Sequence, residues 1–125
     1  LFKSALDDES HSGYTGVITI DKGAQRSDAY QANRNIMLSE GARADTEPML
    51  EIEADDVRCT HGATVGPIDE ETLFYVESRG LSPDDGARLI VEGFFSEVFQ
   101  KFGDARVTQA LAAKVSPHLI RVAAR

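Results

Sequence analysis

Alternating apolar and polar residues predict short β-strands in the first half of the chain. The run at 15–21 (TGVITID) is rich in β-branched residues and leads into a polar turn. In the run at 48–54, three aliphatic residues alternate with one methionine and two glutamates, which is typical of a half-buried strand. Residues 1–14 show no such period, and we expect them to form a mobile lead-in.

A third strand is expected directly after a turn at Asp55 and Asp56. Side chains alternate across a strand, so Val57, Cys59 and His61 share one face. Short strands joined by tight polar turns favour the stacked coils of a parallel β-helix over a hairpin meander. No clean repeat period is visible, so this preference rests on the strands and turns alone.

Helix signals follow the strands. The acidic residues 69–71 suit the first turn of a helix, where the helix dipole favours negative charge. Gly80 suits the left-handed position just past the end of that helix. Ser82 and Pro83 then supply an N-cap and a first helical residue, and they predict a second helix over 83–102.

The helix expected over 83–102 has a broad apolar face. Its apolar residues cover roughly half of the helical wheel, more than the arc of about 100° that a surface helix needs. Two interpretations stay open: the helix packs against its own domain and a partner, or it is a central helix buried within this chain. Val107, Leu111 and Val115 predict a third helix, which Pro117 is expected to interrupt.

These patterns predict a mixed β and α fold, with a β part at 15–66 and a helical subdomain at 67–125. A chain of 125 residues is the size of one domain. The chain opens on Leu1 without an initiator methionine, and its strands are too few to close a sheet. We therefore expect the C-terminal piece of a longer protein.

Charge and composition exclude several classes of function. The net charge is −8, and residues 40–86 hold 13 acidic against 3 basic residues, which disfavours a nucleic-acid partner. One cysteine excludes an internal disulfide and fits a reducing cytoplasm. The apolar runs are far shorter than the roughly 20 residues that span a bilayer, so no membrane span is expected.

Cys59 and His61 are the first candidates for chemistry. A thiolate and an imidazole two residues apart on a strand point the same way and suit a soft or borderline metal. A closed site needs about four ligands, and His11 and His118 are far away in sequence. A lone cysteine is more often a small core residue. His61 lies beside a glycine at the end of the strand, and for it function and burial stay equally open.

Clustered carboxylates form the second candidate site, at Glu51, Glu53, Asp55 and Asp56. Glycoside hydrolysis uses two carboxylates at a set separation, so a β-helix carbohydrate-active enzyme is the alternative function. Acids that alternate along a strand usually belong to a solvated face instead. No nucleophile elbow, phosphate loop or zinc-protease motif occurs, so we expect no enzyme.

The run PMLEIEADDVRCTHGATVGPIDEETLFYVESRGL at 48–81, followed by IVEGFFSEVF at 90–99, resembles the C-terminal part of the SufB/SufD family of iron–sulfur cluster assembly proteins. The segment YTGVITIDKGAQRSDAYQANRNIML at 14–38 fits the same alignment. Two departures make the chain SufD-like rather than SufB-like. Gly62 stands where SufB-like members have glutamate after the histidine, and Asn33 falls close to the position of an essential SufB cysteine.

The resemblance implies the last coils of a right-handed parallel β-helix followed by a C-terminal helical subdomain. It implies a non-catalytic scaffold that pairs with a SufB-like subunit and docks a SufC-type ABC ATPase. His61 would lie at the interface where a transient iron–sulfur cluster forms, with the remaining metal ligands supplied by the partner. Cys59 beside it would be mainly structural, and the chain itself would hold no stable cofactor.

The resemblance also implies a function for the broad apolar helix, as the docking site of the ATPase. Helix-in-groove contacts use anchors at i, i+3, i+4 and i+7, and Val91, Phe95 and Phe99 are the expected anchors for the ATPase. The exposed sheet edge of a truncated β-helix predicts pairing with a second copy of the chain as well. We expect the protein in the cytoplasm, which the single cysteine fits.

Overall fold

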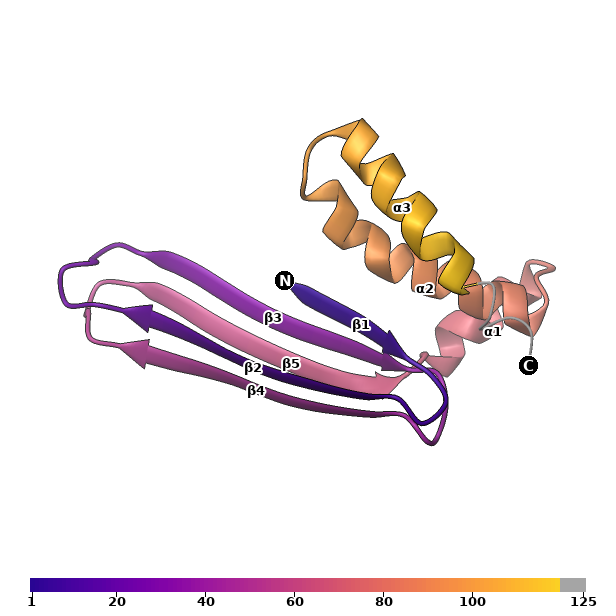
Figure 1. The fold of residues 1–125 in the computed structure, drawn as a ribbon, viewed down its shortest axis with the longest axis horizontal. Helices are drawn as coiled ribbons and strands as arrows, with labels where there is room; N and C mark the ends of the chain where they lie inside the picture. Colours follow the sequence, from indigo (N-terminus) through magenta and orange to yellow (C-terminus); the bar gives the residue numbers. More distant parts are fainter. Residues whose placement is uncertain (120–125) are drawn as a thin grey trace.

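The computed structural model describes residues 1–119 and has a mixed β and α fold (Figure 1). Strands come first along the chain and helices follow them. The strands are β1 (Phe2–Leu6), β2 (His11–Ile20), β3 (Asp28–Met37), β4 (Arg43–Ile52) and β5 (Arg58–Pro67). The helices are α1 (Glu70–Ser78), α2 (Pro83–Gln100) and α3 (Ala105–Leu119).

The strands form two parallel sheets, and the chain alternates between them. One sheet has the order β1-β3-β5 and the other has the order β2-β4. In the β1–β3 pairing, Phe2 lies opposite Asn33, 31 positions later in the sequence. In the β2–β4 pairing, His11 lies opposite Arg43, 32 positions later. The offset between β3 and β5 is 30 positions. The chain therefore has a structural repeat of 30–32 residues, which the sequence pattern does not reveal.

The prediction of an unstructured lead-in at residues 1–14 is wrong. β1 pairs with β3 over its whole length, and the first residues of β2 pair with β4. The ring of Phe2 lies 4.8 Å from the ring of Tyr14, which ties β1 to β2. These strands carry small and polar residues at many positions, so they show no apolar alternation although their backbones are fully paired.

Strand β3 was missed for a related reason, because its buried side chains are polar. Gln31, Asn33 and Asn35 are 4–7% exposed and alternate along the strand. The amide of Asn35 donates hydrogen bonds to Asn33 Oδ1 at 2.6 Å and to the Thr64 carbonyl at 3.2 Å. Gln31 Nε2 donates to Tyr14 Oη at 2.6 Å, which links the two sheets. These hydrogen bonds offset much of the cost of burying the polar side chains, although Gln31 Oε1 is buried without a hydrogen-bond partner among the described residues, so the strand forms without an apolar pattern.

The two strands expected around the acidic turn exist but are longer than expected. β4 ends at Ile52 and begins five residues earlier than the alternating run at 48–54. β5 continues six residues beyond His61 to Pro67. The extra length is paired with β2 and β3, so neighbouring strands, not local pattern, set these bounds.

The predicted helix starts are confirmed. Asp69 caps α1 by accepting a hydrogen bond from the Thr72 N–H at 2.8 Å. Ser82 caps α2 by accepting one from the Asp85 N–H at 3.2 Å, and Pro83 is the first helical residue. Gly80 has φ = +98°, the left-handed conformation that glycine adopts without strain. Local chemistry therefore fixes the turn between α1 and α2.

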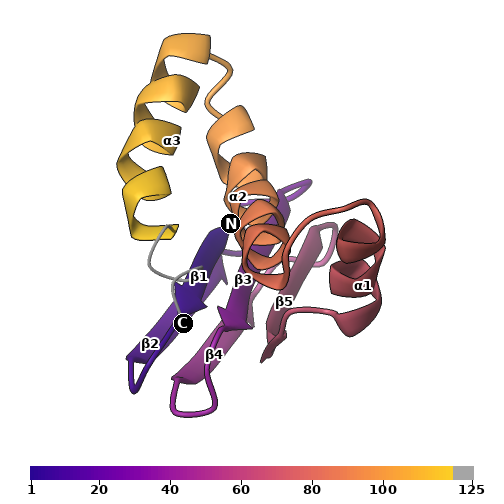
Figure 2. The same cartoon turned by 90° about the vertical axis from the view of Figure 1, so that its right-hand side faces the viewer.

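The two longer helices form a hairpin. α2 lies nearest the strands and α3 stacks against it, as Figures 1 and 2 show. Gly103, with φ = +66°, lies in the connection between them. Pro117 does not interrupt α3, which continues to Leu119. Pro117 lacks the N–H that would bond to the carbonyl four residues before it, yet the helix continues past it. Residues 120–125 lie outside the described residues.

Candidate functional site

Strand β5 carries both residues of the predicted cysteine–histidine pair. β5 is the last strand of its sheet within residues 1–119. Cys59 pairs in register with Ala29, and His61 pairs with Gln31. Paired residues of parallel strands point to the same face, so His61 continues the row that begins with the buried Gln31. His61 is nevertheless exposed and Cys59 is partly buried, because no described strand lies beyond β5.

The described residues do not build a metal site around His61. No group of three or more His, Cys, Asp or Glu side chains close enough to hold a metal ion exists within residues 1–119. Strand β5 therefore offers at most the imidazole of His61 and the partly buried thiol of Cys59 to a metal or cluster. Any closed site here needs ligands from outside the described residues.

The strands at the ends of the two sheets lie next to each other. β5 ends one sheet and β4 ends the other, and the two strands contact each other. An end strand presents unpaired backbone N–H and C=O groups along one side. The described residues leave two such strand edges at the end of the molecule that carries His61, and a partner with matching edges can extend both sheets.

The second candidate site is a groove between α2 and α3. Its volume is about 450 Å³. The rings of Phe95 and Phe99 stack with centroids 6.5 Å apart and an interplanar angle of 14°. Both rings line the groove, opposite small and aliphatic side chains of α3 at Ala112, Val115 and Leu119. The groove is open and largely apolar, which suits an apolar anchor from another protein.

Val91 does not belong to this groove. Its side chain is 0% exposed, and no other large side chain in the described chain is buried as fully. Val91 therefore packs inside the chain and is not available as a surface anchor. Of the three predicted docking residues, Phe95 and Phe99 line the groove, whereas Val91, one turn earlier on the same side of the helix, is fully buried.

The clustered carboxylates lie on the surface. Glu51, Glu53, Asp55 and Asp56 are all exposed. Glu51 accepts a hydrogen bond at 3.3 Å from the Oγ1 of Thr19, which lies opposite it on the adjacent strand β2. This arrangement matches a solvated face and gives none of the four carboxylates the sheltered environment that a general acid requires.

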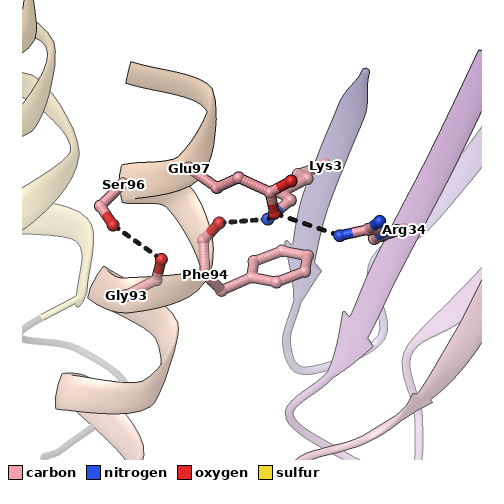
Figure 3. A network of polar contacts seen from close by, with 6 residues as sticks. All are labelled: Lys3, Arg34, Gly93, Phe94, Ser96 and Glu97. Carbon is pink, nitrogen blue, oxygen red and sulfur yellow. Dashed lines mark hydrogen bonds and ion pairs between the residues drawn. The ribbon is translucent and has the colours of Figure 1, made fainter. Parts of the chain in front are cut away.

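A polar cluster attaches α2 to the sheet (Figure 3). The sequence pattern does not reveal this cluster. The Lys3 side chain is 3% exposed and donates a hydrogen bond to the Phe94 carbonyl at 2.6 Å. Its ammonium also pairs with Glu97 and lies 4.3 Å from the centroid of the Phe94 ring. Arg34 Nη1 reaches the same Glu97 carboxylate at 3.1 Å. Lys3 was overlooked because it falls in the segment expected to be a lead-in.

The cluster changes the acidity of Glu97. The hydrogen bond from Lys3 is the largest cause, and it holds the pKa of the Glu97 carboxyl below its ordinary value of 4.5. Desolvation is the second-largest influence and raises the pKa, while the positive charges of Lys3, Arg34 and Lys101 each lower it by a smaller amount. A depressed carboxyl pKa stabilises the folded state above the ordinary pKa, and this contribution is lost as the pH falls through the folded value.

We expect the attachment of α2 to the sheet to loosen in acid. Lowering the pH from 7 should leave amide exchange of β1 unchanged until about pH 4.5, below which Glu97 begins to lose its charge. Exchange should then accelerate, once the intrinsic pH dependence of exchange is subtracted. In Glu97→Gln this acid step should be absent, because residue 97 no longer titrates. An identical acid step in the variant would assign the transition to other carboxyls.

Comparison with known proteins decides the family. Residues 1–94 match the family model described as SUF system FeS cluster assembly, SufBD core domain. This match covers both sheets, α1 and most of α2. The chain belongs to the SufBD family.

Individual relatives agree with this family. The iron–sulfur cluster assembly protein SufD of Escherichia coli K12 is 36% identical over 119 residues, which is 95% of this chain and 28% of that protein. SufD of Bacillus subtilis is 36% identical over 110 residues, 88% of this chain and 25% of that protein. A SufBD family protein of Synechocystis is 35% identical over 116 residues. The chain thus spans only about a quarter of the length of these relatives.

The SufBD assignment gives no support to the carbohydrate-active alternative. The family model and the relatives named above are described as iron–sulfur cluster assembly proteins. Among the described residues, moreover, no helix combines the length and apolarity needed to cross a membrane. His61 and the α2–α3 groove are the two exposed features of the chain considered below as contact sites for other proteins.

Proposed function

We propose that the chain serves as part of a non-catalytic, SufD-like scaffold for iron–sulfur cluster assembly. The observation that carries the proposal is the SufBD core match over residues 1–94. Two of the relatives at 36% identity are SufD proteins, and Gly62 replaces the glutamate expected in a SufB-like chain. The cluster is cargo in this proposal, and the chain holds no resident cofactor.

We further propose that the two sheets are the last coils of a right-handed parallel β-helix. The alternation of successive strands between two parallel sheets supports this architecture. The repeat of 30–32 residues is long enough for one coil made of two strands and two turns. The three helices that follow would then be the helical subdomain of the scaffold.

The edge at β4 and β5 is the proposed contact with a SufB-like subunit. Both sheets end there within the described residues, so a partner with matching edges could extend the two sheets together. His61 is exposed at this edge, and the described residues do not gather three or more possible metal ligands around it. Ligands from the partner would complete a site for a nascent cluster, with Cys59 in a supporting structural position beside it.

The groove between α2 and α3 is the proposed dock for a SufC-type ABC ATPase. Its apolar lining and the stacked rings of Phe95 and Phe99 suit an apolar anchor of the ATPase. Docking on the hairpin would leave the β4 and β5 edge free for the SufB-like subunit. Such an assembly would act in the cytoplasm, where a free cysteine stays reduced.

Reconstitution tests the proposal. The chain is mixed with a SufB-like subunit and a SufC-type ATPase, and the species are resolved by analytical ultracentrifugation. We expect a ternary complex, and we expect the same complex with Glu51→Gln. A folded chain that binds neither protein would contradict the proposed function.

A second copy of the chain is a competing occupant of the same edge. If the chain alone dimerises through β4 and β5, the SufB-like subunit should convert the dimer into a heterodimer. A dimer that persists beside a bound SufB-like subunit would mean that the heterologous contact lies elsewhere on the chain. Sedimentation at increasing concentrations of the SufB-like subunit separates the two results.

A further inference from the structure

The α2–α3 hairpin is attached to the rest of the chain at two places of different character. In its first half, α2 packs on α1, and a side chain at Gly86 would come within 2.9 Å of Val76 and 3.2 Å of Leu73. Val91 is fully buried one turn further along. Contacts of this kind are apolar and depend little on direction, and the turn at Gly80 precedes them. The first half of α2 can therefore act as a pivot.

The second half of α2 is attached by directional polar contacts. The ammonium of Lys3, from β1, is almost completely buried and is bound by the Phe94 carbonyl and the Glu97 carboxylate (Figure 3). Arg34, from β3, holds the same carboxylate at 3.1 Å. One carboxylate of α2 thus joins two neighbouring strands of one sheet.

The buried ammonium makes this attachment costly to break. Removing the carboxylate, or lifting α2 from the sheet, leaves a buried positive charge without its partner, which is strongly unfavourable. Lys3 then has to move into water, and its contact with the Phe94 ring is lost. The ion pair of Arg34 and Glu97 is more exposed and weak on its own. Lys3 therefore contributes most to fixing the orientation of α2 on the sheet.

We propose that Lys3, Arg34 and Glu97 form a latch that fixes the angle of the α2–α3 hairpin on the β1–β3–β5 sheet and transmits movement of the hairpin to that sheet. Lys3 and Glu97 are positioning residues in this device. Fixing the hairpin is a property of the chain alone. Transmission rests on the proposed function, in which the ATPase binds the hairpin.

The first experiment tests the latch without any partner. Spin labels at the exposed positions 60 of β5 and 110 of α3, in a Cys59→Ala background, report the distance between sheet and hairpin by pulsed electron resonance. We expect a narrow distance distribution for the parent chain and for Glu71→Gln, a charge-matched control on α1. Glu97→Gln and Lys3→Met should both broaden it, and amide exchange of β1 should accelerate about tenfold or more. Narrow distributions in both variants would overturn the latch.

Lys3→Met also tests whether a broader distance distribution arises merely because the hairpin unfolds. Methionine keeps an apolar side chain against the Phe94 ring while removing the charge, so the hairpin should stay folded. Circular dichroism should show parental helix content in both variants. Loss of helix in Lys3→Met would overturn the latch, because the residue would then be needed for folding and not only for orientation.

The second experiment tests transmission in the complex with the ATPase. Glu97→Gln should bind the ATPase with parental affinity, because Glu97 does not line the groove. Nucleotide should change amide exchange of β1 and β3 in the parental complex, and this response should be lost in Glu97→Gln. An equal response in both complexes would overturn transmission. If the parent chain itself fails to bind the ATPase, the proposed function fails while the first experiment still decides the latch.

Discussion

Replacing His61 with alanine should remove most cluster assembly from the reconstituted complex while leaving the chain folded. His61 is exposed on β5, so the free energy of unfolding should change by no more than about 0.5 kcal/mol. The described residues hold no group of three or more His, Cys, Asp or Glu side chains that could keep a metal site intact without this imidazole. We expect the rate of cluster formation to fall roughly 10- to 100-fold, the range seen when a metal site loses one supporting group.

The change is measured as the rate at which the characteristic cluster absorbance grows in the complex of the chain, the SufB-like subunit and the ATPase. His11→Ala is the matched control, since His11 is also an exposed histidine at a strand position. Its pair with Asp45, at 2.7 Å, lies on the surface, so its removal should cost little. Parental assembly by His61→Ala, together with a loss of assembly in Glu51→Gln, would refute the role given to His61.

Sequence reasoning recovered the features that depend on local chemistry. The N-caps Asp69 and Ser82 and the positive φ of Gly80 follow from the residue types at those positions. Each of these features is stabilised by contacts within a few residues along the chain. The same holds for the existence of the strands near the acidic turn, although not for their length.

The parts that were missed depend on neighbours that are far away in sequence. β3 has polar residues where a strand is expected to be apolar, and hydrogen bonds to other strands, such as those of Gln31 to Tyr14 and of Asn35 to Thr64, make them acceptable inside. Lys3 is an ordinary surface residue by sequence, and its burial follows from Phe94 and Glu97, more than 90 positions away. A local pattern does not contain such information.

The two candidate sites show the same difference between what local sequence predicts and what only long-range packing reveals. His61 was a candidate from its spacing to Cys59 and its resemblance to a family motif, and the structure adds that it lies on an end strand in line with Gln31. The apolar arc of α2 left two interpretations open, contacts with a partner or burial within the chain, and did not separate the residues that serve each. Val91 faces inward, whereas Phe95 and Phe99 line the groove with α3. Only the packing of the hairpin separates these roles.

The control for the ATPase dock follows from this packing. Phe102 is 60% exposed just beyond α2 and does not line the groove, so Phe102→Asp adds the same charge near the same helix without blocking the proposed site. Ala112 is exposed on α3 and lines the groove, so Ala112→Arg obstructs it while leaving the stacked aromatic rings in place. Together the two changes separate loss of the site from loss of the hairpin.

Phe95→Asp should weaken binding of the SufC-type ATPase by roughly 30-fold or more, since a buried aromatic anchor at an interface contributes about 2 kcal/mol or more. Isothermal titration calorimetry measures the affinity, and circular dichroism establishes that the hairpin is still helical. Ala112→Arg should weaken binding in the same way, and Phe102→Asp should leave it unchanged. Equal affinity for the parent chain and for both groove variants would mean that the ATPase binds another surface. In that case the groove between α2 and α3 would have to be assigned to a different partner, because its stacked rings and apolar lining would still be uncovered.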